Sequence, residues 1–170
     1  LVQKTKFVVE MIGLPKLDDV TRDTLCDIES GVWGVDNDDN IIDFGLTSAL
    51  AISSLKVDIT KGMRIIYTVG ALTDKLLKLV SDSKNIKNVT LVVKDFTKIF
   101  VSETAYRVFC SRGGKIMVLQ KSKLIAVCVN PTAPNGYVLD SDILCGKLEE
   151  ALKLPVYEIV KNEYDIYVCA

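Results

Sequence analysis

The chain has 170 residues, 49% of them hydrophobic and 25% charged, which are the proportions of an ordinary globular domain. Its 21 basic and 22 acidic side chains nearly cancel, so the basic excess that neutralises nucleic-acid phosphates is absent. The sequence contains no histidine, which excludes Ser–His–Asp and Cys–His catalysis and histidine-ligated metals. Any chemistry must therefore use carboxylates, lysines, thiols, hydroxyls, backbone amides or a bound cofactor, and no motif identifies such a cofactor.

Cysteine usage and hydropathy indicate a compartment. The five cysteines are odd in number and form no C-x-x-C pair, which excludes a zinc ribbon or a thioredoxin motif and fits a reducing cytoplasm. No apolar run approaches the ~20 residues that cross a bilayer, and the N-terminus lacks the apolar segment of a signal peptide. The chain does not begin with Met. We expect a cytoplasmic protein with no membrane and no nucleic-acid partner, and we interpret the chain as one part of a larger protein.

The first 45 residues suggest a β-rich appendage. Residues 7–12 are apolar and are followed by Gly13 and Pro15, which predicts a short strand. Two β-compatible runs within residues 31–44 flank an Asp- and Asn-rich loop, which is typical of a hairpin because these residues tolerate the left-handed conformation. Residues 46–60 then carry apolar side chains at helical spacing, which predicts a helix.

The remaining chain repeats one pattern, in which a short apolar run is followed by a polar cluster and an amphipathic stretch. The runs 64–69, 89–93 and 124–129 predict buried central strands, since near-continuous apolar runs need burial on both faces of a sheet. Helices are expected at 72–80, 102–112 and 142–153, with Ser102 as an N-cap. The short connection between strands 116–119 and 124–129 predicts an antiparallel pair, and a further strand is expected at 156–160.

These elements predict an α/β fold, a three-layer Rossmann-like mixed sheet with helices on both faces and an N-terminal β-hairpin region. With no repeat and no convincing linker, we expect one α/β domain over residues 1–170, in which residues 1–45 are the β-rich appendage and residues 46–170 the α/β layer. In open α/β sheets, ligands bind outside the carboxyl ends of the strands. The candidate ligand-binding residues are therefore those that end or follow the three predicted central strands: Thr68, Gly70, Thr73, Asp74, Asp95, Thr97, Asn130 and Thr132.

Each part of this candidate site has two interpretations. The segment from Gly70 to Asp74 opens a helix, where free amides favour an anion, but it matches neither nucleotide-binding glycine motif and is more readily explained by helix capping. Asp95 is a candidate Mg²⁺ ligand because it follows an apolar strand, or it belongs to a plain polar loop. Residues 130–140 form either a binding loop or a stiff connector.

Two functions follow. The first is a ligand-binding or interaction domain without chemistry of its own, with an anionic small molecule as the expected ligand. The alternative is a Mg²⁺-dependent enzyme that acts on a phosphorylated small molecule or nucleotide, with Asp95 as metal ligand. The hairpin of residues 31–44 carries more apolar surface than two strands can bury alone, which predicts packing on the body of the chain, on a partner domain or on a second copy: Val32, Trp33, Val35, Ile41, Ile42 and Phe44.

Overall fold

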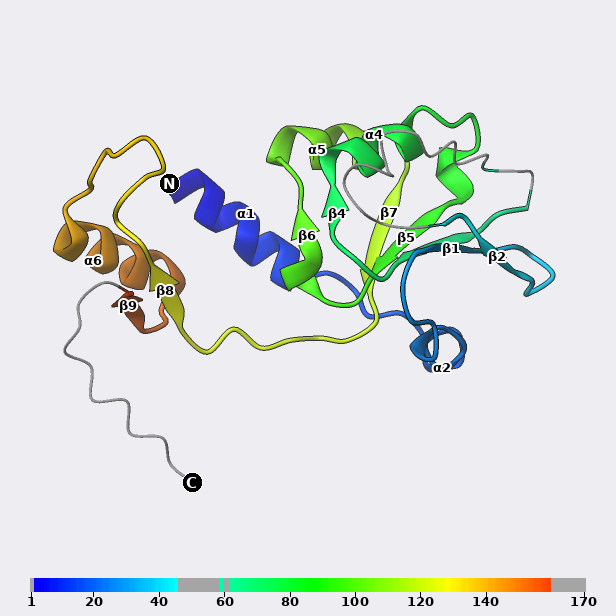
Figure 1. Cartoon of the computed structure of the whole chain (residues 1–170), viewed down its shortest axis with the longest axis horizontal. Coiled ribbons are helices and arrows are strands. Elements are labelled where there is room, and N and C mark those ends of the chain that lie inside the picture. Colours follow the sequence, from blue (N-terminus) through cyan, green and yellow to red (C-terminus); the bar gives the residue numbers. More distant parts are fainter. Residues whose placement is uncertain (1, 46–58, 60–61, 160–170) are drawn as a thin grey trace, which may run out of the picture. The chain divides into compact units, whose positions relative to one another are not determined.

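The computed structural model describes residues 2–45, 59 and 62–159 (Figure 1). They divide into two compact units, one formed by residues within 2–10 and 123–159, the other by residues within 11–122. The described residues contain α-helices together with one five-stranded mixed sheet and two two-stranded sheets. The predicted α/β class is confirmed. None of the described helices is long and apolar enough to span a membrane.

The five-stranded sheet lies within residues 11–122 and has the strand order β2-β1-β3-β5-β7. Strands β3, β5 and β7 run parallel to one another, whereas β1 runs antiparallel to both β3 and β2. The sheet is therefore mixed, as the sequence predicts. The strand bounds are β1 (Val32–Val35), β2 (Ile41–Asp43), β3 (Ile65–Thr68), β5 (Thr90–Val93) and β7 (Lys115–Val118).

Two helical connections join the parallel strands. The first contains β4 (Leu72–Thr73), α4 (Asp74–Ser81) and the 3₁₀ helix η1 (Ile86–Asn88), and the second contains η2 (Phe96–Lys98), β6 (Ile99–Phe100) and α5 (Glu103–Ser111). Ser102 caps α5 as predicted, because its hydroxyl accepts a hydrogen bond from the amide of Ala105 at 3.2 Å. Helix α4 begins two residues later than expected, since Leu72 and Thr73 first pair with β6.

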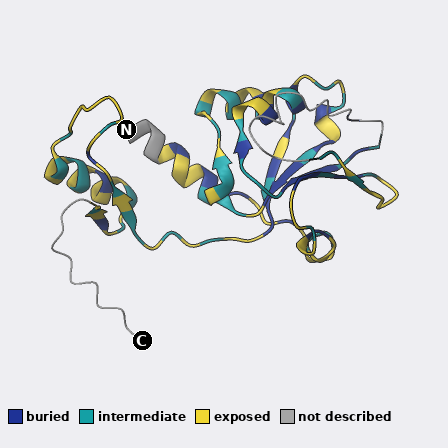
Figure 2. Ribbon diagram, in the orientation of Figure 1, coloured by how far each residue is buried: buried dark blue, intermediate teal, exposed yellow. Residues whose placement is uncertain are grey.

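The core of this unit is built on the two faces of the sheet. On one face, Leu25 of α2 (Asp19–Cys26) belongs to a buried cluster with strand residues whose side chains point to that face: Val35, Ile65, Tyr67 and Val92. Ile66 and Leu91, which point to the other face, are fully buried, as are Leu76 of α4 and Phe109 of α5. Figure 2 shows the resulting buried centre of the sheet. The expectation that residues 64–69 and 89–93 contain buried central strands is confirmed.

The other unit contains a single β-α-β segment. Strand β8 (Val127–Val129) pairs in parallel with β9 (Val156–Glu158), and α6 (Ser141–Leu152) connects them. The predicted placement of residues 124–129 as a central strand, antiparallel to 116–119, is wrong. The amides of Leu119 and Gln120 bond to the carbonyls of Val93 and Lys94, so the chain continues alongside β5 instead of turning back.

Two other local predictions have different outcomes. The predicted strand at residues 7–12 is wrong, because these residues lie in helix α1 (Val2–Ile12). Phe7 and Met11, four residues apart, are buried while Val8 and Val9 are exposed, which is the burial pattern of a helix rather than of a strand. The predicted helix at residues 46–60 lies outside the described residues, apart from residue 59.

Candidate functional site

Six of the eight predicted site residues lie in the unit that holds the five-stranded sheet. Strands β3 and β5 are parallel, with Thr68 opposite Val93, so the segments that follow them leave the sheet at the same edge. Gly70 and Asp95 therefore both lie at this carboxyl edge, which is the arrangement that a shared site requires. Thr68 itself is fully buried, and its hydroxyl donates a hydrogen bond to the carbonyl of Val92 at 3.3 Å.

At the carboxyl edge, the polar groups mostly serve the backbone. The short strands β4 and β6 pair in parallel, with Thr73 opposite Phe100. The hydroxyl of Thr73 accepts a hydrogen bond from the amide of Leu76, which confirms the capping interpretation for this residue. The carboxylate of Asp74 accepts a hydrogen bond from the amide of Ser102 at 2.7 Å. The starts of α4 and α5 are thus held together by their own side chains.

Asp95 has a similar local role. One of its carboxylate oxygens accepts hydrogen bonds from the amide of Thr97, at 2.8 Å, and from the Thr97 hydroxyl, which caps η2. The described part of the chain contains no group of three or more Cys, Asp or Glu side chains that could hold a metal ion. A Mg²⁺ ion at Asp95 would therefore depend mainly on water and substrate ligands, as Mg²⁺ sites with few carboxylates do.

The two remaining predicted residues, Asn130 and Thr132, belong to the other compact unit. The side-chain oxygen of Asn130 accepts a hydrogen bond from the amide of Thr132 at 2.9 Å. Thr132 also forms an isolated antiparallel bridge with Val138. Both residues close the loop between β8 and α6, and the structure does not group them with the six residues at the carboxyl edge.

The larger hollow lies at the opposite, amino edge of the five-stranded sheet. It has a volume of about 580 Å³. Its walls come from the turn between β1 and β2, from the residues before β3, and from the starts of β5 and β7: Asn37, Gly62, Met63, Lys87, Asn88, Thr90 and Lys115. We refer to this hollow as the amino-edge cleft. Sequence reasoning missed it, although Lys87 and Asn88 directly precede an apolar run and Lys115 opens another.

Backbone pairing fixes the floor of the amino-edge cleft. Thr90 and Lys115 are direct neighbours across β5 and β7. The amide of Thr90 donates to the carbonyl of Arg64 at 2.8 Å, and the amide of Arg64 donates to the carbonyl of Val35 at 3.1 Å. A continuous ladder therefore runs from β1 to β7 beneath the cleft, and Thr90 and Lys115 are placed by rigid strands rather than by loops.

Lys87 is positioned by a glycine. Gly113 has a φ of +95°, which favours glycine over other residues. A Cβ atom added to Gly113 would lie 2.9 Å from Cγ of Lys87. The aliphatic stem of Lys87 therefore lies directly against the backbone of Gly113, and a side chain at position 113 would displace it.

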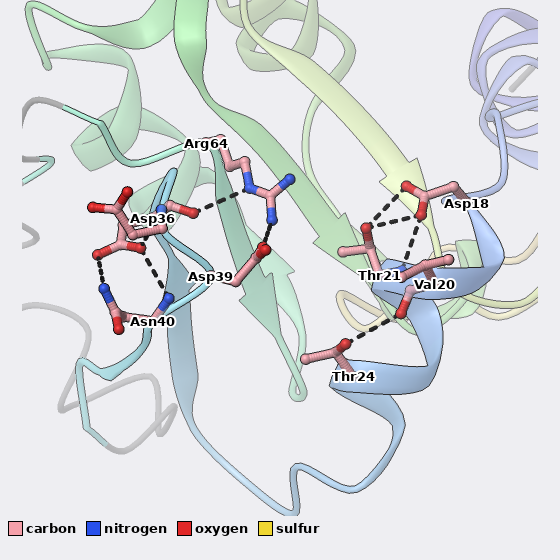
Figure 3. A network of polar contacts seen from close by, with 9 residues as sticks. Asp18, Val20, Thr21, Thr24, Asp36, Asp39, Asn40 and Arg64 are labelled. Carbon is pink, nitrogen blue, oxygen red and sulfur yellow. Dashed lines mark hydrogen bonds and ion pairs between the residues drawn. The ribbon is translucent and has the colours of Figure 1, made fainter.

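The turn that contributes Asn37 is held by a network of polar contacts, shown in Figure 3. One carboxylate oxygen of Asp36 accepts hydrogen bonds from the amides of Asp38 and Asn40, each at 2.9 Å. The guanidinium of Arg64 donates to the carbonyl of Asp36 at 3.1 Å and pairs with the carboxylate of Asp39. Arg64 thus fastens the turn to the start of β3.

The same network shifts an acid–base equilibrium. Hydrogen bonds from the Asn40 side chain, and then from the backbone amides of the turn, hold the pKa of Asp36 below its ordinary value, and the positive charge of Arg64 acts in the same direction. Asp36 is therefore ionised at neutral pH and its oxygens are committed to the turn.

A second, smaller hollow of about 300 Å³ lies between α4 and α5. Its charged side chains are partly engaged with one another. Arg112 donates to the carbonyl of Ser81 at 3.0 Å and pairs with Asp82 at 3.4 Å. This groove contains Asp74, but none of the other predicted site residues lines it.

Comparisons were made with protein-family models, with curated proteins and with solved structures. No family model matches the chain. No curated protein and no solved structure gives a significant match either. The functional assignment below therefore depends on the geometry of the chain itself.

Proposed function

We propose that this chain is a ligand-binding domain without chemistry of its own, and that its ligand occupies the amino-edge cleft. The carrying observation is the cleft itself, whose volume of about 580 Å³ lies within the ~300–1,000 Å³ of small-molecule sites. Two of its polar lining residues, Thr90 and Lys115, sit on strands of the sheet, where backbone pairing fixes their positions before a ligand arrives. Such preorganisation lowers the entropic cost of binding.

A three-layer Rossmann-like arrangement of residues 11–122 is part of this proposal. Its support is the strand order β3-β5-β7, in which two successive parallel connections move in the same direction across the sheet. Such connections are right-handed in nearly all proteins, so they place α4 and α5 on one face. Leu25 of α2 packs on the other face, and Figure 1 draws α2 away from α4 and α5.

We also propose a cytoplasmic location. No disulfide joins the described cysteines Cys26, Cys110 and Cys128. Unpaired thiols of this kind are typical of a reducing compartment, which supports the cytoplasm.

The second candidate function is a Mg²⁺-dependent enzyme that acts on a phosphorylated small molecule or nucleotide. One observation favours it, since Asp74 and Asp95 both follow parallel strands at the carboxyl edge, where α/β enzymes place catalytic groups. The hydrogen bonds that occupy both carboxylates weigh against it.

A thermal-shift screen separates the two functions. A panel of neutral and charged metabolites, with and without Mg²⁺, is tested on the native chain, on Asn88→Trp and on Lys84→Trp. Asn88→Trp fills the cleft, whereas Lys84 is exposed outside it and serves as the matched control. A ligand at a hundred times its Kd stabilises the native chain by ~2.7 kcal/mol.

The proposal expects this shift in the native chain and in Lys84→Trp, and its loss in Asn88→Trp. A Mg²⁺-dependent shift that survives Asn88→Trp but disappears in Asp95→Ala would support the enzyme and contradict the proposal. A panel without any shift would contradict both.

A further inference from the structure

We infer that the ligand of the amino-edge cleft is a small organic phosphate, held by the ammonium groups of Lys87 and Lys115. This inference rests on the proposed function and specifies the chemical class of the ligand. The two lysines come from different elements, one from η1 and the other from the first position of β7, and both line the same cleft.

The lining of the cleft is positively charged. Lys87 and Lys115 are the charged groups among its described lining residues, and no described carboxylate joins them. Neither lysine forms an ion pair with another described residue. Two ammonium groups around one hollow repel each other. A bound anion attracts both of them and so offsets that repulsion.

The neutral lining groups suit phosphate oxygens. Asn37 and Asn88 carry amide groups and Thr90 carries a hydroxyl, and all three are hydrogen-bond donors. A phosphate monoester carries nearly two negative charges at neutral pH and offers three strong acceptor oxygens. The two lysine charges and three neutral donors therefore match the charge and the acceptor oxygens of a phosphate monoester more closely than those of a single carboxylate. Lysine is a common partner of phosphate in this role.

The distribution of charge over the whole unit supports an anionic ligand. Residues 11–45 contain two basic and nine acidic side chains, whereas residues 62–122 contain eleven basic and four acidic ones. The near-zero net charge of the chain hides this segregation. Six of the seven described residues that line the cleft belong to the basic segment 62–122. Positive charge near a cleft raises the local concentration of anionic ligands and accelerates their association.

The few acidic groups within residues 62–122 are already engaged. Asp82 pairs with Arg112, and Glu103 pairs with Arg107. Asp74 and Asp95 accept hydrogen bonds from backbone amides, as described above. None of these four carboxylates lines the amino-edge cleft, so Lys87 and Lys115 have no carboxylate beside them among its described lining residues.

The acidic turn beside the cleft does not reverse this conclusion. Asp39 pairs with Arg64, the ionised carboxylate of Asp36 accepts bonds from the amides of its own turn, and neither Asp36 nor Asp38 lines the cleft. The residue of the turn that lines the cleft is the uncharged Asn37.

A small molecule fits the cleft better than a nucleic-acid strand does. Single strands bind in grooves that combine positive charge with aromatic platforms for the bases. None of the described lining residues is aromatic, and the hollow has the volume of a small-molecule site. A DNA strand is included among the probes below so that nucleic-acid binding would be detected.

The test is isothermal titration of the whole chain with pyrophosphate, adenosine monophosphate, adenosine, citrate and a 20-nucleotide DNA strand. The variants are Lys87→Gln and Lys115→Gln, with Lys84→Gln and Lys121→Gln as controls that remove the same charge outside the cleft. Far-ultraviolet circular dichroism and the thermal midpoint verify that each variant is folded.

We expect pyrophosphate and adenosine monophosphate to bind and adenosine to fail. Each cleft variant should weaken binding at least tenfold, whereas each control should change it less than twofold. Raising the salt from 50 to 300 mM should weaken binding several-fold, because the attraction is between charges.

Several results would overturn the inference. Binding of adenosine that is insensitive to both cleft variants but lost in Asn88→Trp would refute the phosphate class and leave the proposed function intact. Stronger binding of citrate than of both phosphates would assign a carboxylate ligand instead. Stronger binding of the DNA strand would assign a nucleic-acid partner, and phosphate binding unchanged in both cleft variants would place the site elsewhere. No binding by any probe would refute the phosphate class, while the metabolite screen with Asn88→Trp decides the proposed function independently.

Discussion

The carboxylate of Asp74, the first residue of α4, accepts a hydrogen bond from the backbone amide of Ser102, the N-cap of α5, at 2.7 Å. This bond joins the starts of the two helices that connect the parallel strands. The neighbouring pairing of Leu72 with Ile99 brings the same two segments together through their backbones. One side chain therefore helps to hold the carboxyl edge of the sheet in register.

Replacing Asp74 tests this link. We expect Asp74→Ala to lower the free energy of unfolding by about 1–2 kcal/mol, since it leaves the Ser102 amide without its acceptor. Asp74→Asn retains a carbonyl oxygen and should lose less than half of that. Urea unfolding measures the shift in midpoint at an unchanged m-value. Equal midpoints for the native chain and both variants would show that the bond contributes nothing.

Asp95 gives a second prediction. Asp95→Ala should cost about 1 kcal/mol, the usual effect of removing a cap, because the Thr97 amide loses its acceptor. Thermal unfolding with Mg²⁺ or with sodium at equal ionic strength should give the same midpoint for the native chain. Asp95→Asn keeps the capping oxygen and is the control. A rise in the native midpoint with Mg²⁺, absent in Asp95→Asn, would instead support metal binding at this residue.

Two glycines should respond in opposite directions to alanine. A Cβ at Gly114 would lie 2.3 Å from the ring of Phe109, which is fully buried, so Gly114→Ala should destabilise by about 1–3 kcal/mol. Gly146 lies inside α6 with nothing within 4 Å of the added atom. Gly146→Ala should stabilise by about 0.5–1 kcal/mol, since alanine favours helix. Chemical denaturation measures both, and a Gly114→Ala variant as stable as the native chain would contradict the packing described for Phe109.

The acidic turn makes stability depend on pH. The folded-state pKa of Asp36 is lowered, so its contribution is fully present above its unfolded pKa of ~3.9 and is lost as the pH falls through the lower folded value. The difference in unfolding free energy between the native chain and Asp36→Asn should be constant from pH 7 to 5 and should shrink below about pH 4. A difference that stays flat down to pH 2 would show that Asp36 titrates normally.

Trp33 distinguishes packing on the chain itself from self-association. Its neighbours Val32 and Val35 are buried within residues 11–122, and its indole nitrogen donates to the carbonyl of Ser30 at 3.2 Å. Because Trp33 is partly exposed, Trp33→Ala should cost roughly 2–3 kcal/mol, below the ~3–5 kcal/mol of full burial. This loss should not depend on protein concentration. A dimer that dissociates in Trp33→Ala, seen by sedimentation, would support docking through the hairpin of residues 31–44.

Local sequence signals predicted the helices and buried strands that depend on neighbours in the chain. Ser102 caps α5 because a serine hydroxyl just before an amphipathic stretch accepts a hydrogen bond from a free amide of the first helical turn. The runs that contain β3 and β5 are mostly apolar because both faces of the sheet are covered. These properties require no knowledge of distant residues.

Features that depend on distant partners were not predictable in the same way. The run at 124–129 is as apolar as that of β5, yet Cys128 is exposed, because β9 is the single strand that β8 pairs with in the described part of the chain. Residues 7–12 are too short for periodicity to separate helix from strand. The amino-edge cleft depends on the register that sets Thr90 beside Lys115, and nothing within either segment specifies that alignment.

The strand order also implies an order of assembly. Strands β1 and β2 are joined by a turn of five residues, whereas 29 residues separate β1 from β3 and 21 separate β3 from β5 and β5 from β7. Closing longer connections delays pairing, so the β1–β2 hairpin should form first and offer the free edge of β1 as a template for β3. During synthesis, the ribosome would release the acidic half of the unit before the basic half exists. Amide exchange pulses during refolding should therefore protect Phe44, whose amide donates to the carbonyl of Val32, ahead of Met117.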